Sequence, residues 1–423
     1  MRRLLTGVER ESPRHVIKLL HTADWHLGAA LQGWTREPEQ RAALTQIVDI
    51  ARRREVDAIV VVGDVFDTHN PSADAQRLLF ETLRDLRAAC PHAAIALVAG
   101  NHDPASRLEA PRALFDLAGV VCVGTIARNA GGIDLNTHLT PLRERSGRTG
   151  AFLLSVPYPR FCDLPIADDD AAGSSVVCAV RALYAEMIGA AREKIGGAPL
   201  VVTGHLHIAG AIESEGAERR ILVGGEHAAP CDIFPRDLAY VALGHLHRPQ
   251  SVGRPTIRYA GSLAPMSKTE IDYAHGVALV TIGDDGATSI ERETFARSVA
   301  HLRLPERGAL PIGEIDNALA ALNLDPAAPT DRRPFLHLSV LVEGPAVGLK
   351  AEIDAVVDNH PVRLVSLHVE RPRRDDATAP EAALLRLSER DPADLFKEAF
   401  ERAHQAPPTS EHLRLFAELA REE

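Results

Sequence analysis

Five short apolar runs, each followed at once by a turn rich in aspartate, asparagine or histidine, constrain this chain more than any other feature of its sequence. The runs cover residues 16–20, 58–62, 94–99, 200–203 and 240–243. Their length and apolar character predict strands buried on both faces, and helical periodicity between the first three predicts a β-α-β-α-β order with largely parallel pairing. We therefore expect an α/β fold in which the five polar turns meet at the carboxyl ends of strands.

The five polar turns contain residue types that bind metal ions. In chain order they read Asp24-Trp25-His26, Gly63-Asp64-Val65-Phe66-Asp67, Gly100-Asn101-His102-Asp103, Gly204-His205-Leu206-His207 and Gly244-His245-Leu246-His247. Each pattern alone is weak evidence, because an isolated Asp-x-His is usually a surface accident and a Gly-Asp is usually a turn. Five such patterns in order, each after an apolar run, indicate one shared site. The glycines permit the tight turns that aim these side chains back over the strand ends.

The composition limits the chemistry of this site and the location of the protein. Five cysteines are scattered without a Cys-x-x-Cys pair, so neither a disulfide framework nor a thiolate zinc site is expected, and a reducing cytoplasm is predicted. Any metal must then be held by carboxylates and by some of the 19 histidines. The formal charge of −11 argues against a broad basic surface for nucleic acid. Neither a membrane span nor a signal peptide is expected, so no membrane partner is predicted.

The hydrophobic pattern divides the chain into four parts. We expect a disordered extension over 1–15, a domain with the five motifs over 16–296, a small α+β domain over 297–372, and a linker with two helices over 373–423. Within the second part, the stretch from about 125 to 175 is expected to be rich in loops. The final helices carry apolar stripes and are expected to bury them against a partner, with their own core as the alternative.

The ordered motifs resemble those of the calcineurin-like metallophosphoesterases, which read D-x-H, G-D-x-x-D, G-N-H-D/E, G-H and G-H-x-H. Residues 20–28, 63–68 and 240–250 are closer still to the bacterial SbcD-type DNA repair nuclease subunits. The resemblance spans nearly the whole chain from about residue 16 and is looser beyond about 275. It implies a four-layer α/β/β/α sandwich with a small α+β capping domain and C-terminal helices.

The same resemblance implies a set of metal ligands. One ion would be held by Asp24, His26, Asp64 and His247, and a second by Asp64, Asn101, His205 and His245, so that Asp64 bridges the two. Independently of the resemblance, a ligand set of oxygen and imidazole without thiolate suits divalent manganese, iron or zinc. We expect two divalent ions, with manganese preferred and zinc, iron or magnesium as alternatives. Two such ions can activate a water molecule and attract a phosphodiester.

Three further residues are expected to act beside the metal ligands. In the family pattern His102 is not a ligand, and it would protonate or hydrogen-bond the departing oxygen. Asp67 or Asp103 could fix the tautomer of His102, and Asp67 is preferred because related phosphatases use the last aspartate of this motif in that way. His207 could have a direct role, but an indirect hydrogen bond is favoured. His21 is expected to line the cleft.

Four more positions have competing interpretations. His69 is expected to line the cleft, while Trp25 and Phe66 are expected to pack, with stacking on an unpaired base as the alternative. Residues 52–54, three arginines, end a predicted helix, and interaction with its dipole is favoured over DNA binding.

The resemblance implies a metal-dependent DNA nuclease, with 3′–5′ exonuclease activity on duplex ends and endonuclease activity on single strands or hairpins. Its expected partners are DNA and an SbcC-type coiled-coil ATPase, in DNA repair, recombination and replication, and a homodimer within a heterotetramer is implied. The first alternative is a phosphodiesterase or phosphatase acting on a small molecule or protein. Protein phosphatases of this superfamily have arginine and glutamate where this chain has Thr68 and Asp103, which disfavours that alternative. A non-catalytic scaffold is disfavoured because all the ligand positions are filled.

Overall fold

The computed structural model describes residues 16–165, 175–214, 228–342 and 348–371, with residues 396–397, 400, 407–409 and 412–413 near the end of the chain. The chain forms two compact units, Met1–Arg371 and Pro372–Glu423. The predicted extension over 1–15 and most of the predicted tail, with its two helices, lie outside the described residues. Among those described, no helix is both long enough and apolar enough to cross a membrane.

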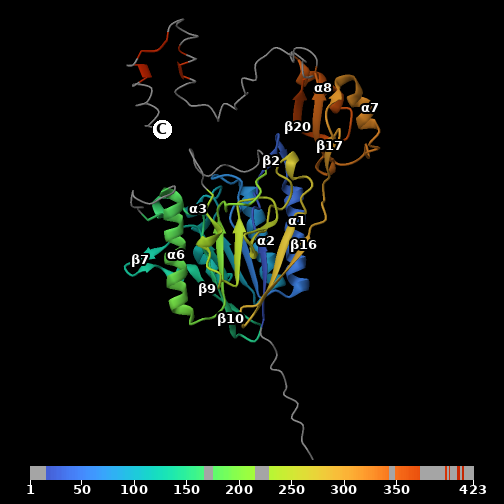
Figure 1. The fold of residues 1–423 in the computed structure, drawn as a ribbon. Coiled ribbons are helices and arrows are strands. Elements are labelled where there is room, and N and C mark those ends of the chain that lie inside the picture. The colour runs from blue at the N-terminus through green and yellow to red at the C-terminus, as the bar shows by residue number, and fades with distance from the viewer. Residues whose placement is uncertain are drawn as a thin grey trace, which may run out of the picture. The chain divides into compact units, whose positions relative to one another are not determined.

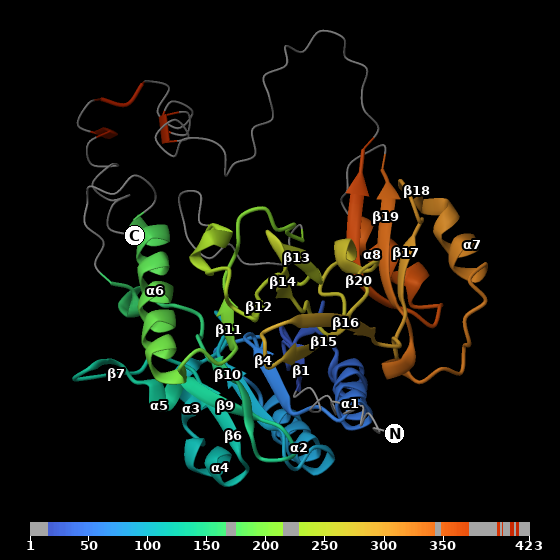
Figure 2. The same ribbon diagram turned by 60° about the horizontal axis from the view of Figure 1, so that its bottom comes forward.

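The first of two six-stranded sheets contains three of the five predicted strands (Figures 1 and 2). Its strands, in spatial order, are β16 (Thr288–Thr294), β15 (Gly276–Gly283), β1 (Val16–Thr22), β4 (Ala58–Val62), β5 (Ala94–Val98) and β6 (Val120–Val123). The strands from β1 to β6 pair in parallel, as predicted, whereas β15 and β16 extend the sheet by antiparallel pairing. The carboxyl ends of β1, β4 and β5 therefore lie at one edge.

The second sheet contains the other two predicted strands at its centre. Its strands, in spatial order, are β13 (Gln250–Val252), β14 (Arg254–Tyr259), β12 (Tyr240–Gly244), β11 (Leu200–His205), β10 (Thr149–Leu154) and β9 (Leu139–Arg143). The strands from β14 to β10 are parallel, and β13 and β9 close the two edges in antiparallel orientation. The polar turns after β11 and β12 consequently emerge side by side.

The two sheets pack face to face because their strands are apolar on both sides. In β1, Ile17 and Leu19 contribute to the core between the sheets, whereas Leu20 packs on the helical side. Helices α1 (Glu37–Arg54) and α2 (Ala73–Ala89) cover the first sheet, and α6 (Ser175–Ile195) covers the second. The predicted four-layer α/β/β/α sandwich is confirmed.

Local signals in the sequence explain where the two long helices of the first sheet begin and end. Ser72 caps α2, since its hydroxyl accepts the N–H of Ala75. Helix α1 begins earlier than its apolar stripe, with acidic residues in the first turn and three arginines in the last. Two of these arginines, Arg53 and Arg54, pair with Glu293 of β16.

A small α+β unit follows the sandwich. Its elements are β17 (His301–Leu304), β18 (Leu310–Pro311), α7 (Ile315–Ala320), β19 (Phe335–Leu341), α8 (Leu349–Val357) and β20 (Arg363–Glu370). The strands pair in parallel around β19, and β18 adds a short edge. We call this unit the cap. It has its own core, in which Leu336, Leu338 and Ile353 are almost fully buried.

The sequence failed to predict β9 and β10, which lie in the stretch expected to be loop-rich. Edge strand β9 contains Pro141 and only one fully buried residue, Leu142, so it lacks the continuous apolar run of an inner strand. In β10, Gly150 lies next to Ile17 of β1, where a Cβ would come within 2.9 Å of that side chain.

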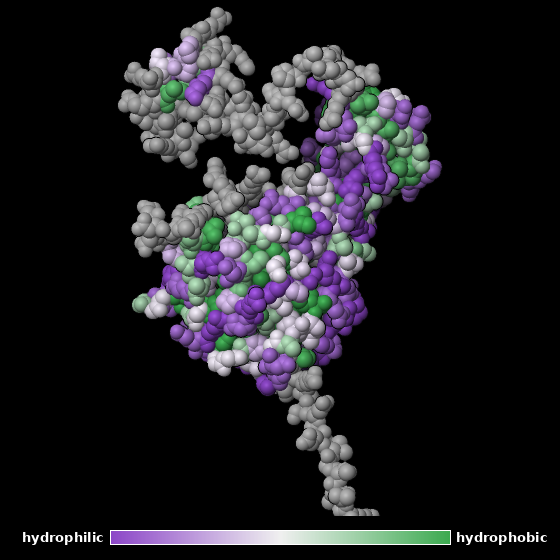
Figure 3. Space-filling view, in the orientation of Figure 1, coloured by the Kyte–Doolittle hydropathy of each residue, from purple (hydrophilic) through white to green (hydrophobic). Residues whose placement is uncertain are grey.

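The remaining elements of the first unit are short. They are the hairpins β2 (Ala30–Leu31) with β3 (Trp34–Thr35) and β7 (Arg128–Asn129) with β8 (Gly132–Ile133), and helices α3 (Ala105–Glu109), α4 (Arg112–Leu117) and α5 (Leu135–His138). On the face shown in Figure 3, hydrophilic and hydrophobic residues are intermixed.

Candidate metal centre

All seven residues that the sequence analysis assigned to metals come together where β1, β4, β5, β11 and β12 end. Potential ligand atoms form two groups, and within each group all of them lie within 4.8 Å of one another. One group is His26, Asp64 and His102, and the other is Asp64, His205 and His245. Asp64 belongs to both groups. A carboxylate has two oxygens, so Asp64 in this position can bind one cation on each side, as expected for a residue that bridges two metal ions.

The first cluster of nitrogen ligands consists of His26 and His247. Their Nε2 atoms are 3.1 Å apart, and Nε2 of His26 is 3.7 Å from Oδ2 of Asp64. Carboxylates face the opposite ring nitrogens: Oδ1 of Asp67 is 3.3 Å from Nδ1 of His26, and Oε1 of Glu270 is 3.0 Å from Nδ1 of His247. Each carboxylate favours a proton on Nδ1, which leaves two Nε2 lone pairs facing each other. A cation between them would relieve this repulsion.

The second cluster has the same character. Nδ1 of His205 donates to the backbone carbonyl of Val62 at 3.1 Å, so its Nε2 presents a lone pair once the ring has lost its second proton. That Nε2 lies 3.0 Å from Oδ1 of Asn101 and 3.3 Å from Oδ1 of Asp64, and Oδ1 of Asn101 is also 3.2 Å from Nδ1 of His245. Electron-rich atoms therefore converge on one point, which suits a bound cation.

Asp24 supplies a further test of this fit. Its Oδ1 accepts the backbone N–H of His245 at 2.9 Å, but its Oδ2 is buried and has no hydrogen-bond partner. Burial raises the pKa of Asp24 to about 7. An orphaned carboxylate oxygen beside imidazoles is unfavourable in a protein interior and is satisfied by a cation. The donor set thus fits divalent metal ions.

Backbone conformation aims these side chains. Asp24, His26, Asp64 and His245 all have positive φ, at 51°, 45°, 47° and 98°. Non-glycine residues rarely adopt this conformation, and it is concentrated at functional sites where the fold imposes it. Four of the seven predicted ligands therefore occupy strained turns, and these turns are the ones that the sequence motifs mark.

The electrostatics of the centre are dominated by Asp64 and His205. Burial alone would raise the pKa of Asp64, but the neighbouring His205 and His26 lower it below its ordinary value. Burial alone would lower the pKa of His205, but the Asp64 carboxylate raises it to about 9. Without a cation this pair is charged, and binding a cation must displace the proton from His205.

His102 lies beside the first cluster, but its ring is held differently from the prediction. Its Nδ1 lies 2.8 Å from the backbone carbonyl oxygen of Asp67, whereas the Asp67 carboxylate faces His26. Asp103 accepts three backbone N–H groups, from Val65, Phe66 and Gly100, at 2.8–3.1 Å. The prediction that a carboxylate of Asp67 or Asp103 fixes the His102 tautomer is therefore corrected: a backbone carbonyl makes that contact, and Asp103 joins two loops.

The structure resolves the ambiguous histidines. His207 is 22% exposed and pairs with Glu213 at 3.2 Å, outside both clusters of ligand atoms. His21 is fully buried, and its Nδ1 lies 3.0 Å from the hydroxyl of Tyr240, so the prediction that it lines the cleft is wrong. His69 is exposed.

The two aromatic residues of the motifs pack in the core. Trp25 and Phe66 are almost fully buried, and the indole N–H of Trp25 donates to the hydroxyl of Thr22 at 3.0 Å. The packing interpretation of these rings is therefore confirmed, and base stacking by them is excluded because their faces are covered.

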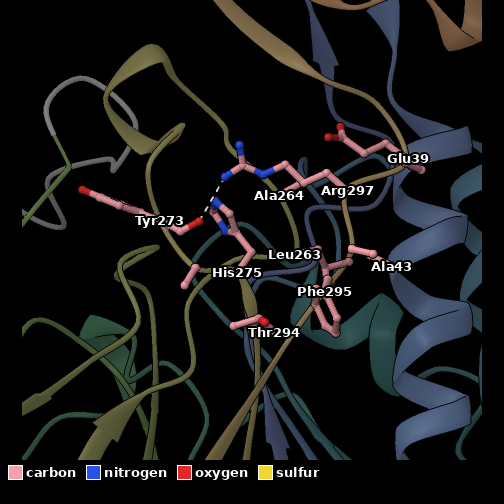
Figure 4. A pocket seen from close by; sticks show the side chains of 12 residues that line it. Glu39, Ala43, Leu263, Ala264, Tyr273, His275, Thr294, Phe295 and Arg297 are labelled. Atoms are coloured by element: carbon pink, nitrogen blue, oxygen red, sulfur yellow. Dashed lines mark hydrogen bonds between the residues drawn. The ribbon is translucent and has the colours of Figure 1, made fainter.

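One residue at the centre was missed by the sequence analysis. Glu270, which is fully buried, contacts His247 although it follows it by 23 positions. No motif marks it, because it lies in a stretch of weak periodicity and only the fold brings it back to the site. A cavity of about 230 Å³, which none of the proposed ligands lines, lies between Glu39 and Ala43 of α1 and residues 263–264, 273–275 and 294–298 (Figure 4).

The fold and this centre agree with the comparison to known families. Residues 17–249 match the calcineurin-like phosphoesterase family, which defines the class of protein: this chain is a metallophosphoesterase. Residues 300–404 match a family described as the type 5 capsule protein repressor C-terminal domain.

Curated relatives define the class further. A protein of Rhodobacter capsulatus, named as the SbcD component of the SbcCD nuclease, is 45% identical over 388 residues, covering 91% of this chain and 94% of that protein. Proteins of the same name from Escherichia coli K12 and Bacillus subtilis are 29% and 34% identical, over 86% and 62% of this chain and 88% and 66% of their own lengths. The chain therefore belongs to the SbcD family of nuclease subunits.

Proposed function

We propose that this chain is the metal-dependent nuclease subunit of an SbcCD-type complex, hydrolysing DNA phosphodiesters as a 3′–5′ exonuclease on duplex ends and an endonuclease on single strands or hairpins. The observation that carries the proposal is Asp64, whose carboxylate belongs to both clusters of potential ligand atoms. The names of the relatives, all nuclease subunits, support DNA as the substrate.

The proposed ligands of the first ion are Asp24, His26, Asp64 and His247. Those of the second are Asp64, Asn101, His205 and His245. Both ions are divalent, and manganese is proposed because the set combines imidazole with hard oxygen ligands. When bound, such ions lower the pKa of a water molecule and stabilise negative charge on phosphoryl oxygens.

His102 is proposed as the proton donor to the departing oxygen. With Nδ1 donating to the carbonyl of Asp67, the ring presents Nε2, and protonation there gives a hydrogen-bond donor. The ring of His102 lies edge-on to that of His26, with centroids 4.9 Å apart. Asp67 and Asp103 are proposed as positioning residues that hold the loops around His102 rather than as groups that exchange protons.

The proposed partners are DNA and an SbcC-type coiled-coil ATPase, with a homodimer of this chain inside a heterotetramer. The proposed site for the ATPase is the region 373–423, whose sequence carries two apolar helical stripes. A cytoplasmic location belongs to the same proposal.

A substrate panel tests this proposal. The purified chain, with and without its ATPase partner, is incubated with Mn²⁺ and end-labelled duplex DNA, a DNA hairpin, a cyclic nucleotide or a phosphopeptide. We expect Mn²⁺-dependent loss of the duplex from its 3′ ends and cleavage of the hairpin. Rapid turnover of the cyclic nucleotide or phosphopeptide with both DNA substrates intact would overturn it in favour of a small-molecule or protein phosphoesterase.

A further inference from the structure

A fully buried carboxylate connects the metal centre to the protein around it. Both oxygens of Glu270 are engaged: Oε1 lies 3.0 Å from Nδ1 of His247, and Oε2 accepts the backbone N–H of Met266 at 2.8 Å. Glu270 has no exposed surface. A carboxylate behind a ligand imidazole fixes its tautomer and orientation, so a displacement of Glu270 is transmitted to Nε2 of His247.

The contacts continue from this loop to the start of α1. Nη1 of Arg36 lies 2.8 Å from Sδ of Met266, and Nε of Arg36 donates to Oε2 of Glu39 at 2.8 Å. Arg36 is 1% exposed and Glu39 is 4% exposed. The arginine–glutamate pair is thus held in the protein interior, immediately beside the loop that carries Glu270.

The same pair reaches the cap. The second oxygen of Glu39, Oε1, lies 3.1 Å from Nε2 of His301 in β17, and Nδ1 of His301 lies 3.3 Å from Nε2 of His337 in β19. Both histidines are buried. A series of contacts, buried except at the half-buried Met266, therefore runs from the cap to His247.

Glu39 also lies at the edge of a cavity. Figure 4 shows the cavity of about 230 Å³ with Glu39 and Ala43 of α1 on one side and Tyr273 and His275 on the other. Because that space is not filled by side chains, packing around Glu39 is incomplete. Burying the Arg36–Glu39 ion pair costs desolvation energy that apolar residues would avoid. Attachment of the cap to the sandwich therefore does not by itself explain why an ion pair is buried at this place.

We propose that the Arg36–Glu39 pair couples the seating of the cap, through Met266 and the positioning residue Glu270, to the affinity of the metal site that contains His247. The proposal rests on the proposed function only in requiring metal ions at this centre. When His301 contacts Glu39, Arg36 is held against Met266 and Glu270 is held behind His247. When the cap shifts, this support is lost and the first metal site weakens while the second keeps its ligands.

The first test changes the carboxylate behind the imidazole. Glu270→Gln keeps the size of the side chain but offers only one acceptor to its two donors. We expect Mn²⁺ titration of the full chain by calorimetry to show one of two equivalents weakened by about 10- to 100-fold. The matched control is Glu213→Gln, which alters the same kind of contact at His207, a histidine outside the ligand clusters, and should leave both equivalents unchanged.

The second test changes the junction between α1 and the cap. Glu39→Gln should weaken the same equivalent by on the order of 2- to 30-fold, the range expected for coupling through a contact network. His301→Asn, on the cap side, leaves the Arg36–Glu39 pair in place and should also weaken the binding of that Mn²⁺ equivalent. This second variant keeps the test valid if Glu39→Gln does not fold. The control is Asp272→Asn, which breaks the exposed junction pair Arg303–Asp272 and should have no effect.

The outcomes separate the two proposals. If Glu39→Gln and His301→Asn lower the melting temperature but bind both Mn²⁺ equivalents as the wild type does, the junction only attaches the cap and the coupling is refuted. If Glu270→Gln binds both equivalents normally, its positioning role is refuted. If the wild-type chain itself binds no Mn²⁺, the proposed metal-dependent function fails instead.

Discussion

At the scale of single residues, the groups behind the imidazoles define the candidate centre as clearly as the ligands do. Carboxylates face Nδ1 of His26 and His247, and backbone carbonyls face Nδ1 of His205 and His102. In the neutral form of each ring the proton is drawn to Nδ1, and Nε2 keeps its lone pair. Three of these rings are proposed to bind metal through that nitrogen, and the fourth to carry a proton on it.

His102→Asn is expected to lower hydrolysis of a phosphodiester by about 10²- to 10⁴-fold, because a proton donor is lost. Mn²⁺ content should stay at two equivalents per chain, measured by elemental analysis beside the rate. His207→Asn is the control, since that histidine contacts Glu213 and not the centre, and its rate should equal that of the wild type. Loss of one Mn²⁺ in His102→Asn would instead make His102 a ligand, as its place beside His26 and Asp64 allows.

Metal affinity is expected to rise with pH. In the metal-free protein, burial raises the pKa of Asp24 to about 7, and Asp64 raises that of His205 to about 9 despite burial. Both groups must lose a proton before they bind a cation, so Mn²⁺ competes with protons below these values and binding releases protons. Calorimetry in buffers of different ionisation enthalpy should show proton release that decreases between pH 6 and pH 9. If the affinity for Mn²⁺ did not change over this pH range, the assignment of both residues as ligands would be contradicted.

At the scale of elements, the turns after the strands decide whether the ligands meet. They leave no room for side chains at their glycines: a Cβ at Gly63 would lie 1.9 Å from Nδ1 of His205, and one at Gly100 would lie 2.1 Å from Oδ1 of Asp64. The strand ends approach so closely that only hydrogen fits. The close approach also explains why glycine precedes the ligands in these motifs.

Gly63→Ala is expected to abolish binding of at least one Mn²⁺ and to lower the melting temperature. Its φ of 79° is strained for alanine, at about 1 kcal/mol, and the added methyl group displaces His205. Gly197→Ala is the matched control, because Gly197 has φ 89° but nothing within 4 Å of the added Cβ. Gly197→Ala should lower the melting temperature through a similar backbone strain, but both metal sites should stay intact. Equal metal binding by the two variants would show that the turn after β4 tolerates a side chain.

Asp103→Asn tests the joining of two of these turns. The Asp103 carboxylate accepts three backbone N–H groups from the turns after β4 and β5, and the amide cannot accept all of them equally well. We expect the free energy of unfolding in urea to fall by about 1–3 kcal/mol. The pH profile of hydrolysis should keep its shape, whereas a shifted profile would restore the role of Asp103 in setting the protonation of His102.

At the scale of the whole molecule, the net charge of −11 disfavours a broad basic surface, so the proposed binding of DNA is expected to depend on the centre and on a partner. Truncation after Arg371, at the border between the two compact units, should leave Mn²⁺-dependent hydrolysis of bis(p-nitrophenyl) phosphate within about 2-fold of the full chain. Co-purification with the ATPase should be lost, because the proposed docking region is removed. Retained co-purification would place the ATPase contact on the first unit.

Much of the fold was predictable because its inner strands are buried on both faces. Such strands read as continuous apolar runs, as in Ala58–Val62, and the polar turns after them follow directly in the sequence. Edge strand β9, with Pro141 in its middle, gives no such run and was missed. The tertiary hydrogen bonds of the edges, which the local sequence does not encode, decide whether such segments become strands.

The sequence by itself determined the order of the central strands along the chain, the types of the candidate ligand residues and the α/β class, since these depend on local composition and spacing. Only the tertiary structure decided that Glu270 supports His247, that the Asp67 carbonyl and not its carboxylate holds His102, and that a buried Arg36–Glu39 pair meets the cap at His301. These contacts join residues from different elements or depend on whether backbone or side chain faces a ring. Their geometry is set by packing and backbone torsion, which no short stretch of sequence specifies.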